Sequence, residues 1–173
     1  MIRTFDLKTS YRPIKRLDSN QYMISWDYKE HLNPIEKENE ETEYTDSIYA
    51  SWVSKVLYLP TIQAIKDIIL AYYNEQIDNK ILSGFEWNGY KVWLSSENQF
   101  NYKAAYDLAV QTQGASLPVT FKFGSDTEPQ YHIFTTLEDL HNFYTSAISY
   151  INTTLAEGWQ IKDSIDWSKY EIK

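Results

Sequence analysis

Two stretches in the first half of the chain alternate between apolar and polar residues, the pattern typical of half-buried β-strands. They are residues 21–28 and 48–59, and Trp26 and Trp52 are in phase with the apolar faces. We therefore expect these segments to pair as an antiparallel hairpin, with both tryptophans in the core. Residues 30–47 between them are polar and acidic, which predicts a long solvated loop.

Two short mixed segments, residues 2–7 and 11–17, precede this hairpin. Pro13 lacks an amide hydrogen, so the second segment is restricted to an edge strand or an extended arm. Two interpretations of residues 1–16 stay open. The arm pairs with the chain's own sheet beside residues 21–28, or it adds a strand to the sheet edge of a partner protein.

The next part of the chain predicts a helix and a tight hairpin. Isoleucines at spacings of three and four follow Pro60, which predicts a helix to about residue 79. Asn88-Gly89 separates two short alternating segments, and both residues accept the positive φ of a two-residue hairpin turn. Trp87 and Trp93 flank this turn at positions that suit a cross-strand pair.

Capping boxes predict two further helices, one from Ser96 and one from Thr135. Gly114 and Gly158 are expected to end these helices, and a second hairpin is expected between them over residues 119–134. The predicted apolar faces comprise Phe100, Ala104, Ala105, Leu108 and Ala109 in the first helix, and Leu137, Leu140, Tyr144, Ala147, Ile148, Ile151 and Leu155 in the second.

This order of elements predicts an α+β protein, with N-terminal antiparallel strands plus one helix, then a hairpin–helix–hairpin–helix module. A length of 173 residues suits one domain or two small ones. We place the boundary between an N-terminal β-rich docking region, residues 1–80, and a C-terminal α+β module, residues 81–173.

The composition excludes several classes of protein. Hydrophobic residues make up 43% of the chain and charged residues 23%, which excludes collagenous, low-complexity and fully disordered chains. The absence of cysteine excludes disulfides, thiolate zinc sites and a cysteine nucleophile. No apolar stretch is long enough to span a membrane, and the N-terminus lacks the apolar region of a signal peptide. We expect synthesis in a cytosol, without standard export, and no membrane partner.

The formal net charge is −8, and it is unevenly distributed. Seven acidic residues and one lysine lie between Glu30 and Asp46, whereas residues 1–16 contain five basic residues and one acidic residue. Because a phosphate backbone would repel the chain overall, nucleic acid is not expected as a partner. The acidic segment is expected to help association with a basic partner or with the basic arm of another copy.

No recognised catalytic or phosphate-binding motif appears in the sequence. It contains neither a Gly-x-Ser-x-Gly elbow nor a glycine-rich phosphate loop. His31, His132 and His141 do not form the i, i+4 pair that zinc sites favour. The acidic segment has no glycine to turn around a calcium ion, so a solvated loop is favoured. We therefore assign no catalytic, metal-binding or cofactor-binding residue and expect that the protein is not an enzyme.

Aromatic residues make up 16% of the chain, enough to fill a core and also to form contact surfaces. Candidate interface residues lie in the N-terminal arm and in the C-terminal segment after Gly158, where less core remains to be filled. They are Ile2, Phe5, Tyr11, Trp159, Trp167 and Tyr170.

The second half of the chain also shows a family resemblance. The run FEWNGYKVWLSSENQFN over residues 85–101 combines a Trp-Asn-Gly hairpin with a polar-capped helix. A second hairpin between Leu117 and Phe134, a long helix and the segment KDSID at residues 162–166 follow. This order resembles a domain of unknown function from tailed-phage proteins over roughly residues 81–170. The whole chain also resembles small uncharacterised proteins of phages that infect gut bacteria.

Such domains lie at the C-terminal ends of small phage and prophage proteins, many described as tail-fibre assembly or tail-associated proteins, and the family implies no catalytic residues. The resemblance implies a virion or tail-fibre-associated structural protein of a bacteriophage, which acts through protein–protein contacts with other phage structural proteins. The alternatives are a tail-fibre assembly chaperone and a host-glycan-binding module that uses exposed tyrosine and tryptophan. The implied location is the host cytoplasm during assembly and then the phage virion. Whether copies of the chain self-associate stays open.

Overall fold

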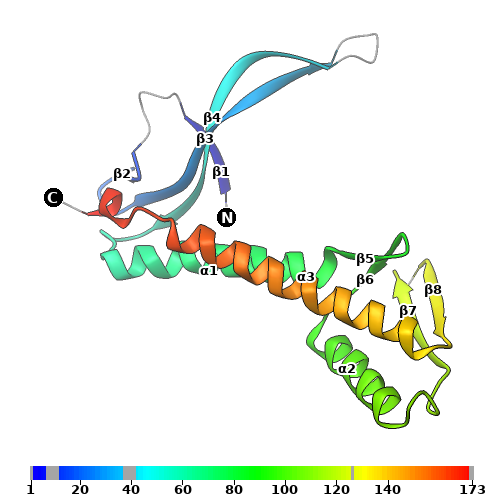
Figure 1. Ribbon diagram of the computed structural model, residues 1–173. Coiled ribbons are helices and arrows are strands. Elements are labelled where there is room, and N and C mark those ends of the chain that lie inside the picture. The colour runs from blue at the N-terminus through cyan, green and yellow to red at the C-terminus, as the bar shows by residue number, and fades with distance from the viewer. Residues whose placement is uncertain (1, 7–11, 37–41, 126, 172–173) are drawn as a thin grey trace. The chain divides into compact units, whose positions relative to one another are not determined.

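The computed structural model describes residues 2–6, 12–36, 42–125 and 127–171, with the backbone alone at 2–6, 29–36 and 42–50 (Figure 1). It contains helices and antiparallel sheets, so the predicted α+β class is confirmed. The chain forms two compact units. The first comprises Met1–Ala71 and Asp166–Lys173, and the second comprises Tyr72–Ile165. The expected boundary after residue 80 differs from this division in two ways. The first break falls after Ala71, and the last residues of the chain belong with the N-terminal strands.

A four-stranded antiparallel sheet of order β1-β4-β3-β2 dominates the first unit. Trp26 lies opposite Trp52, so the predicted antiparallel pair is confirmed. Residues 23–26 are all buried, which shows that both faces of this part of the sheet are covered rather than one. Trp26 lies in the core as expected, whereas Trp52 is half-buried. The strands are β1 (Ile2–Asp6), β2 (Ile14–Arg16), β3 (Tyr22–Glu36) and β4 (Thr42–Val56).

The N-terminal arm pairs with the chain's own sheet in the described residues. β2 lies beside β3, with Ile14 opposite Ile24, as the first interpretation expected. β1 instead lies at the other edge of the sheet beside β4, with Ile2 opposite Val53 and Phe5 opposite Ala50. The two segments of the arm are therefore the two edge strands of the sheet.

The acidic segment is not the long loop predicted from its charge. β3 continues to Glu36 and β4 begins at Thr42, so most of residues 30–47 belong to strands. The register of the β3–β4 pair shifts between Trp26 and Lys29 and again between Asn33 and Pro34. The second shift coincides with Pro34, which cannot donate a hydrogen bond to the ladder. Threonine, tyrosine and isoleucine recur over residues 42–49 and favour strand despite the acidic neighbours.

The remaining elements follow the predicted order. α1 contributes residues 62–71 to the first unit and residues 72–83 to the second. Asn88 and Gly89 have φ values of 51° and 79°, which confirms the predicted hairpin turn. The elements are α1 (Ile62–Ser83), β5 (Phe85–Trp87), β6 (Tyr90–Val92), α2 (Ser96–Gln111), β7 (Val119–Gly124), β8 (Pro129–Phe134), α3 (Leu137–Asp163) and the 3-10 helix η1 (Trp167–Tyr170).

Both predicted capping residues are wrong by one position. The Ser95 side chain accepts a hydrogen bond from the amide of Asn98 and caps α2, and the Thr136 side chain accepts one from the amide of Asp139 and caps α3. Each site has two adjacent hydroxyl residues, Ser95-Ser96 and Thr135-Thr136, and serine and threonine are both preferred N-cap residues.

The buried face of α2 also differs from the predicted face. Tyr102 and Ala109 are buried, whereas the side chains of Phe100 and Leu108 are 70% and 51% exposed. Tyr102 turns inward because it packs against aromatic residues of β7 and α3, and burial raises the pKa of Tyr102 to about 12.

Phe143 of α3 lies at the centre of the core of the second unit. Its side chain is fully buried, and six aromatic rings surround it with centroid distances between 5.0 and 6.3 Å. These rings come from both hairpins and from α2, so one side chain of α3 joins four other elements. They are Phe85 and Trp87 of β5, Tyr102 of α2, Phe121 and Phe123 of β7, and Phe134 of β8.

The prediction that Gly158 ends the last helix is wrong. Gly158 lies inside α3, which continues to Asp163. A Cβ atom on this residue would lie 2.2 Å from Cδ1 of Ile77 on α1. Nearby, Nζ of Lys80 lies 2.7 Å from a carboxylate oxygen of Glu157, and Nζ of Lys162 lies 2.8 Å from Oδ1 of Asn74. The two helices are therefore antiparallel here, and the Ile77 side chain occupies the space that a side chain at position 158 would need.

We predict that the effect of Gly158→Ala depends on Ile77. In the natural chain the added methyl group meets Ile77, and overpacking costs about 1–3 kcal/mol, more than the roughly 1 kcal/mol of helix propensity gained. In an Ile77→Ala background the obstacle is gone, so the same substitution should stabilise the protein. Urea unfolding of the four variants measures this change of sign. An equal effect of Gly158→Ala in both backgrounds would contradict the packing account.

Candidate functional site

A surface around Trp93 is the candidate site in the second unit. We define the Trp93 surface by the residues that line two adjoining depressions of about 380 and 350 Å³, which share Trp93, Gly124 and Ser125. One depression is completed by Asn98 and Lys122, and the other by Gly89, Tyr90, Lys91, Glu128 and Gln130. The site therefore lies between the end of the first hairpin and the turn of the second.

The start of α2 fixes the chain on which Trp93 lies. The side-chain amide of Asn98 donates a hydrogen bond to the Trp93 carbonyl at 2.8 Å, and that of Gln99 donates to the Leu94 carbonyl at 2.6 Å. The Leu94 amide donates to the Leu82 carbonyl at 3.0 Å, and the Leu94 side chain is buried. Asn98 and Gln99 therefore hold the segment that leads out of β6.

The indole of Trp93 is held by its polar edge. Its Nε1–H donates to the Gly124 carbonyl at 3.0 Å, while the side chain stays 43% exposed. Gly124 has a φ of 75°, and a Cβ atom there would lie 2.5 Å from the Glu128 carbonyl oxygen, so this turn requires glycine. The hydroxyl of Ser125 accepts a hydrogen bond from the Glu128 amide at 3.0 Å. Because the polar edge is used internally, the ring presents apolar area to solvent in a fixed orientation.

The position of Trp93 differs from the expected cross-strand pair. Trp87 lies opposite Tyr90, and its ring packs edge-on against Phe143 instead. Trp93 follows β6 and lies beyond the paired residues. Two tryptophans that looked equivalent in the sequence therefore have different roles, one in the core and one at the surface.

The six predicted interface residues come from different parts of the chain. Ile2 and Phe5 belong to the edge strand β1, and Tyr11 lies outside the described residues. In the second unit, the Trp159 side chain is 54% exposed on α3. In the first unit, Trp167 is half-buried with the Lys66 ammonium 5.5 Å from its ring centroid.

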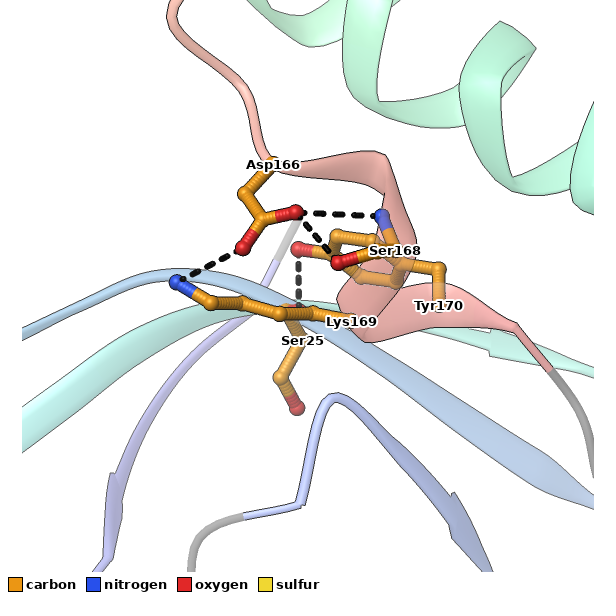
Figure 2. Close-up of polar contacts among 5 residues, drawn as sticks. All are labelled: Ser25, Asp166, Ser168, Lys169 and Tyr170. Atoms are coloured by element: carbon orange, nitrogen blue, oxygen red, sulfur yellow. Dashed lines mark hydrogen bonds and ion pairs between the residues drawn. The ribbon is translucent and has the colours of Figure 1, made fainter.

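Tyr170 is part of the internal structure rather than an exposed contact residue. Its side chain is 6% exposed, and its hydroxyl donates a hydrogen bond to the Ser25 carbonyl of β3 at 3.0 Å (Figure 2). We call Asp166, Ser168, Lys169 and Tyr170 the C-terminal clasp. The clasp joins the end of the chain to the first sheet, which explains why these residues belong to the first unit.

Asp166 organises the clasp from the start of η1 (Figure 2). Its carboxylate accepts hydrogen bonds from the Ser168 hydroxyl at 2.6 Å and the Ser168 amide at 3.2 Å, and Lys169 lies 3.6 Å away. The hydrogen bond from the Ser168 side chain holds the pKa of Asp166 below its ordinary value of 3.8. The carboxylate therefore stabilises the folded clasp fully above its ordinary pKa of 3.8, and this contribution is lost as the pH falls through the lowered value.

The described histidines make ordinary polar contacts. Nε2 of His132 lies 3.3 Å from a carboxylate oxygen of Asp139, and Nδ1 of His141 lies 2.7 Å from the Tyr106 hydroxyl. No group of three or more acidic or histidine side chains suited to a metal ion occurs in the part of the chain that the structure describes. The side chain of His31 lies outside the described part.

Comparison with protein-family models, curated proteins and solved structures gives no match for this chain. Among the described residues, no helix combines the length and apolar character needed to cross a membrane.

We predict that Tyr170→Phe lowers the free energy of unfolding by about 1 kcal/mol, the usual net contribution of one hydrogen bond. The ring stays in place, and the bond to the Ser25 carbonyl is lost. Tyr58→Phe is the matched control in the same unit, because the Tyr58 side chain is 61% exposed. Chemical unfolding of both variants tests this. Equal, negligible losses in the two variants would show that the clasp does not stabilise the fold.

Proposed function

We propose that this protein is a non-enzymatic structural protein of a bacteriophage particle, associated with the virion or the tail fibre, and that it acts through protein–protein contacts. The resemblance of the second half to tailed-phage proteins supports the setting. The hairpin–helix–hairpin–helix order on which that resemblance depends is present in residues 85–163. The proposed mode of action is supported by the first unit.

The distal part of the β3–β4 hairpin is the observation that carries this proposal. β1 pairs only with residues 49–53 of β4, and β2 only with residues 22–24 of β3. The hairpin continues from His31 to Glu36 and from Thr42 to Ile48, where no third strand joins it in the described residues (Figure 1). We call these two segments the ribbon.

A two-stranded ribbon is marginally stable by itself in water, and its open edges expose unpaired backbone donors and acceptors. A partner that adds a strand to either edge satisfies these groups and stabilises the ribbon. The ribbon and its connection are acidic, which favours a partner with a basic sheet edge. The docking role expected for the N-terminal arm thus moves to the ribbon, because the arm pairs with its own sheet.

A tail-fibre assembly chaperone uses the same kind of contact but leaves the mature particle. Mass spectrometry of purified particles separates the two functions. A structural protein is present at a fixed ratio to other virion proteins, whereas a chaperone is found with the fibre protein in infected cells and is absent from particles.

We predict that a shortened ribbon leaves the fold intact and abolishes assembly. Replacing residues 34–45 by Asn-Gly joins the opposed residues Asn33 and Asp46 through a two-residue turn. The melting temperature should change by a few degrees at most, because the described residues of the removed part pair only with one another. Particles made with this variant should lack the protein.

A charge variant separates backbone pairing from electrostatics in the same experiment. Glu36→Gln with Glu43→Gln keeps the ribbon and removes two of its charges, so incorporation should persist but depend less on salt. Normal incorporation of the shortened variant would contradict docking through the ribbon.

A further inference from the structure

We propose that the Trp93 surface is a saccharide-binding site. The proposal does not depend on the ribbon or on the phage setting, since it concerns a separate surface of the second unit. It assigns a ligand class, a linear oligosaccharide, to residues that carry no role in the proposed assembly function.

The indole of Trp93 is both fixed and exposed. Carbohydrate recognition needs a flat apolar face against which the C–H bonds of a sugar ring pack, in an orientation that does not move on binding. Trp93 meets both needs, because its Nε1–H is bonded to the Gly124 carbonyl while 43% of the side chain stays exposed. Fixing the ring before binding reduces the entropy lost when a ligand is held.

Polar side chains line both depressions beside Trp93. Asn98 and Ser125 border one depression, and Glu128 and Gln130 border the other. Amide, hydroxyl and carboxylate groups provide both donors and acceptors, which suits the hydroxyl groups of a sugar. Lysine and glutamate both line the surface, so it does not select a strongly charged ligand of one sign.

The size of the two depressions and the residues that they share suit an extended ligand. The two depressions share Trp93, and their volumes of about 380 and 350 Å³ lie near the lower end of small-molecule sites, about 300–1,000 Å³. A chain of sugar rings that occupies both depressions contacts the residues that they share, Trp93 among them. Tyr90 in the second depression is 42% exposed and offers a second aromatic contact.

The site is also supported from beneath by rigid structure. Val92 and Leu94 on either side of Trp93 are buried, and β6 lies beside β7. Asn98 and Gln99 hold the local backbone from α2. Precise placement of the ring and the polar groups therefore comes from three elements that share one core.

The test is binding of the full-length protein to an array of neutral and acidic oligosaccharides, followed by a calorimetric titration with each oligosaccharide that binds. We expect saturable binding of at least one, and a loss of more than tenfold in affinity with Trp93→Ala. Trp159→Ala is the matched control, since this tryptophan is also exposed but lies outside the surface. It should bind like the natural chain.

Two rim variants keep the proposal testable if Trp93→Ala disturbs folding. Tyr90→Ala and Gln130→Ala alter exposed side chains of the second depression and should weaken binding while the melting temperature is unchanged. Binding to no oligosaccharide would overturn the proposal. Binding that survives the Trp93 and rim variants, or that is lost with Trp159→Ala, would also overturn it, as would binding of peptides alone through this surface.

Discussion

The packing of six aromatic rings around Phe143 is the interaction on which the second unit depends. Each ring pair adds about 0.5–1.5 kcal/mol beyond the area it buries, and the six partners come from β5, α2, β7 and β8. Two short hairpins are weak structures by themselves. They become stable here because each contributes rings to the same buried side chain of α3, and that shared core sets their positions within the unit.

The function proposed for the Trp93 surface follows from this constraint. Trp93 leaves one hairpin and bonds to Gly124 of the other, so its ring is fixed only while both hairpins are held. The first unit is held together by a different contact. Its sheet is joined to the end of the chain by the Tyr170 hydroxyl, whereas its ribbon extends without a third strand in the described residues. One unit therefore has a surface tryptophan fixed by two hairpins, and the other has strand edges that no third strand covers in the described residues.

Local patterns predicted the element order because turn and cap chemistry act over a few residues. The positive φ values of Asn88 and Gly89 illustrate this. Features that depend on distant partners were missed. Gly158 reads as a helix stop until Ile77, far away in sequence, is placed beside it. Phe143 fits the spacing of Leu140 and Ala147 and was detectable as a core residue, although its central position was not.

Native-state hydrogen exchange on Phe143→Leu tests the central claim most directly, because it reports the stability of each element separately. The account predicts that amide protection in β5, β6, β7, β8 and α2 falls together by a common factor, while protection in β3 and β4 near Trp26 is retained. Phe100→Leu, which alters an exposed ring of α2, should leave all protection unchanged. A loss confined to α3, or to one hairpin, would contradict the claim that this single aromatic cluster holds the second unit together.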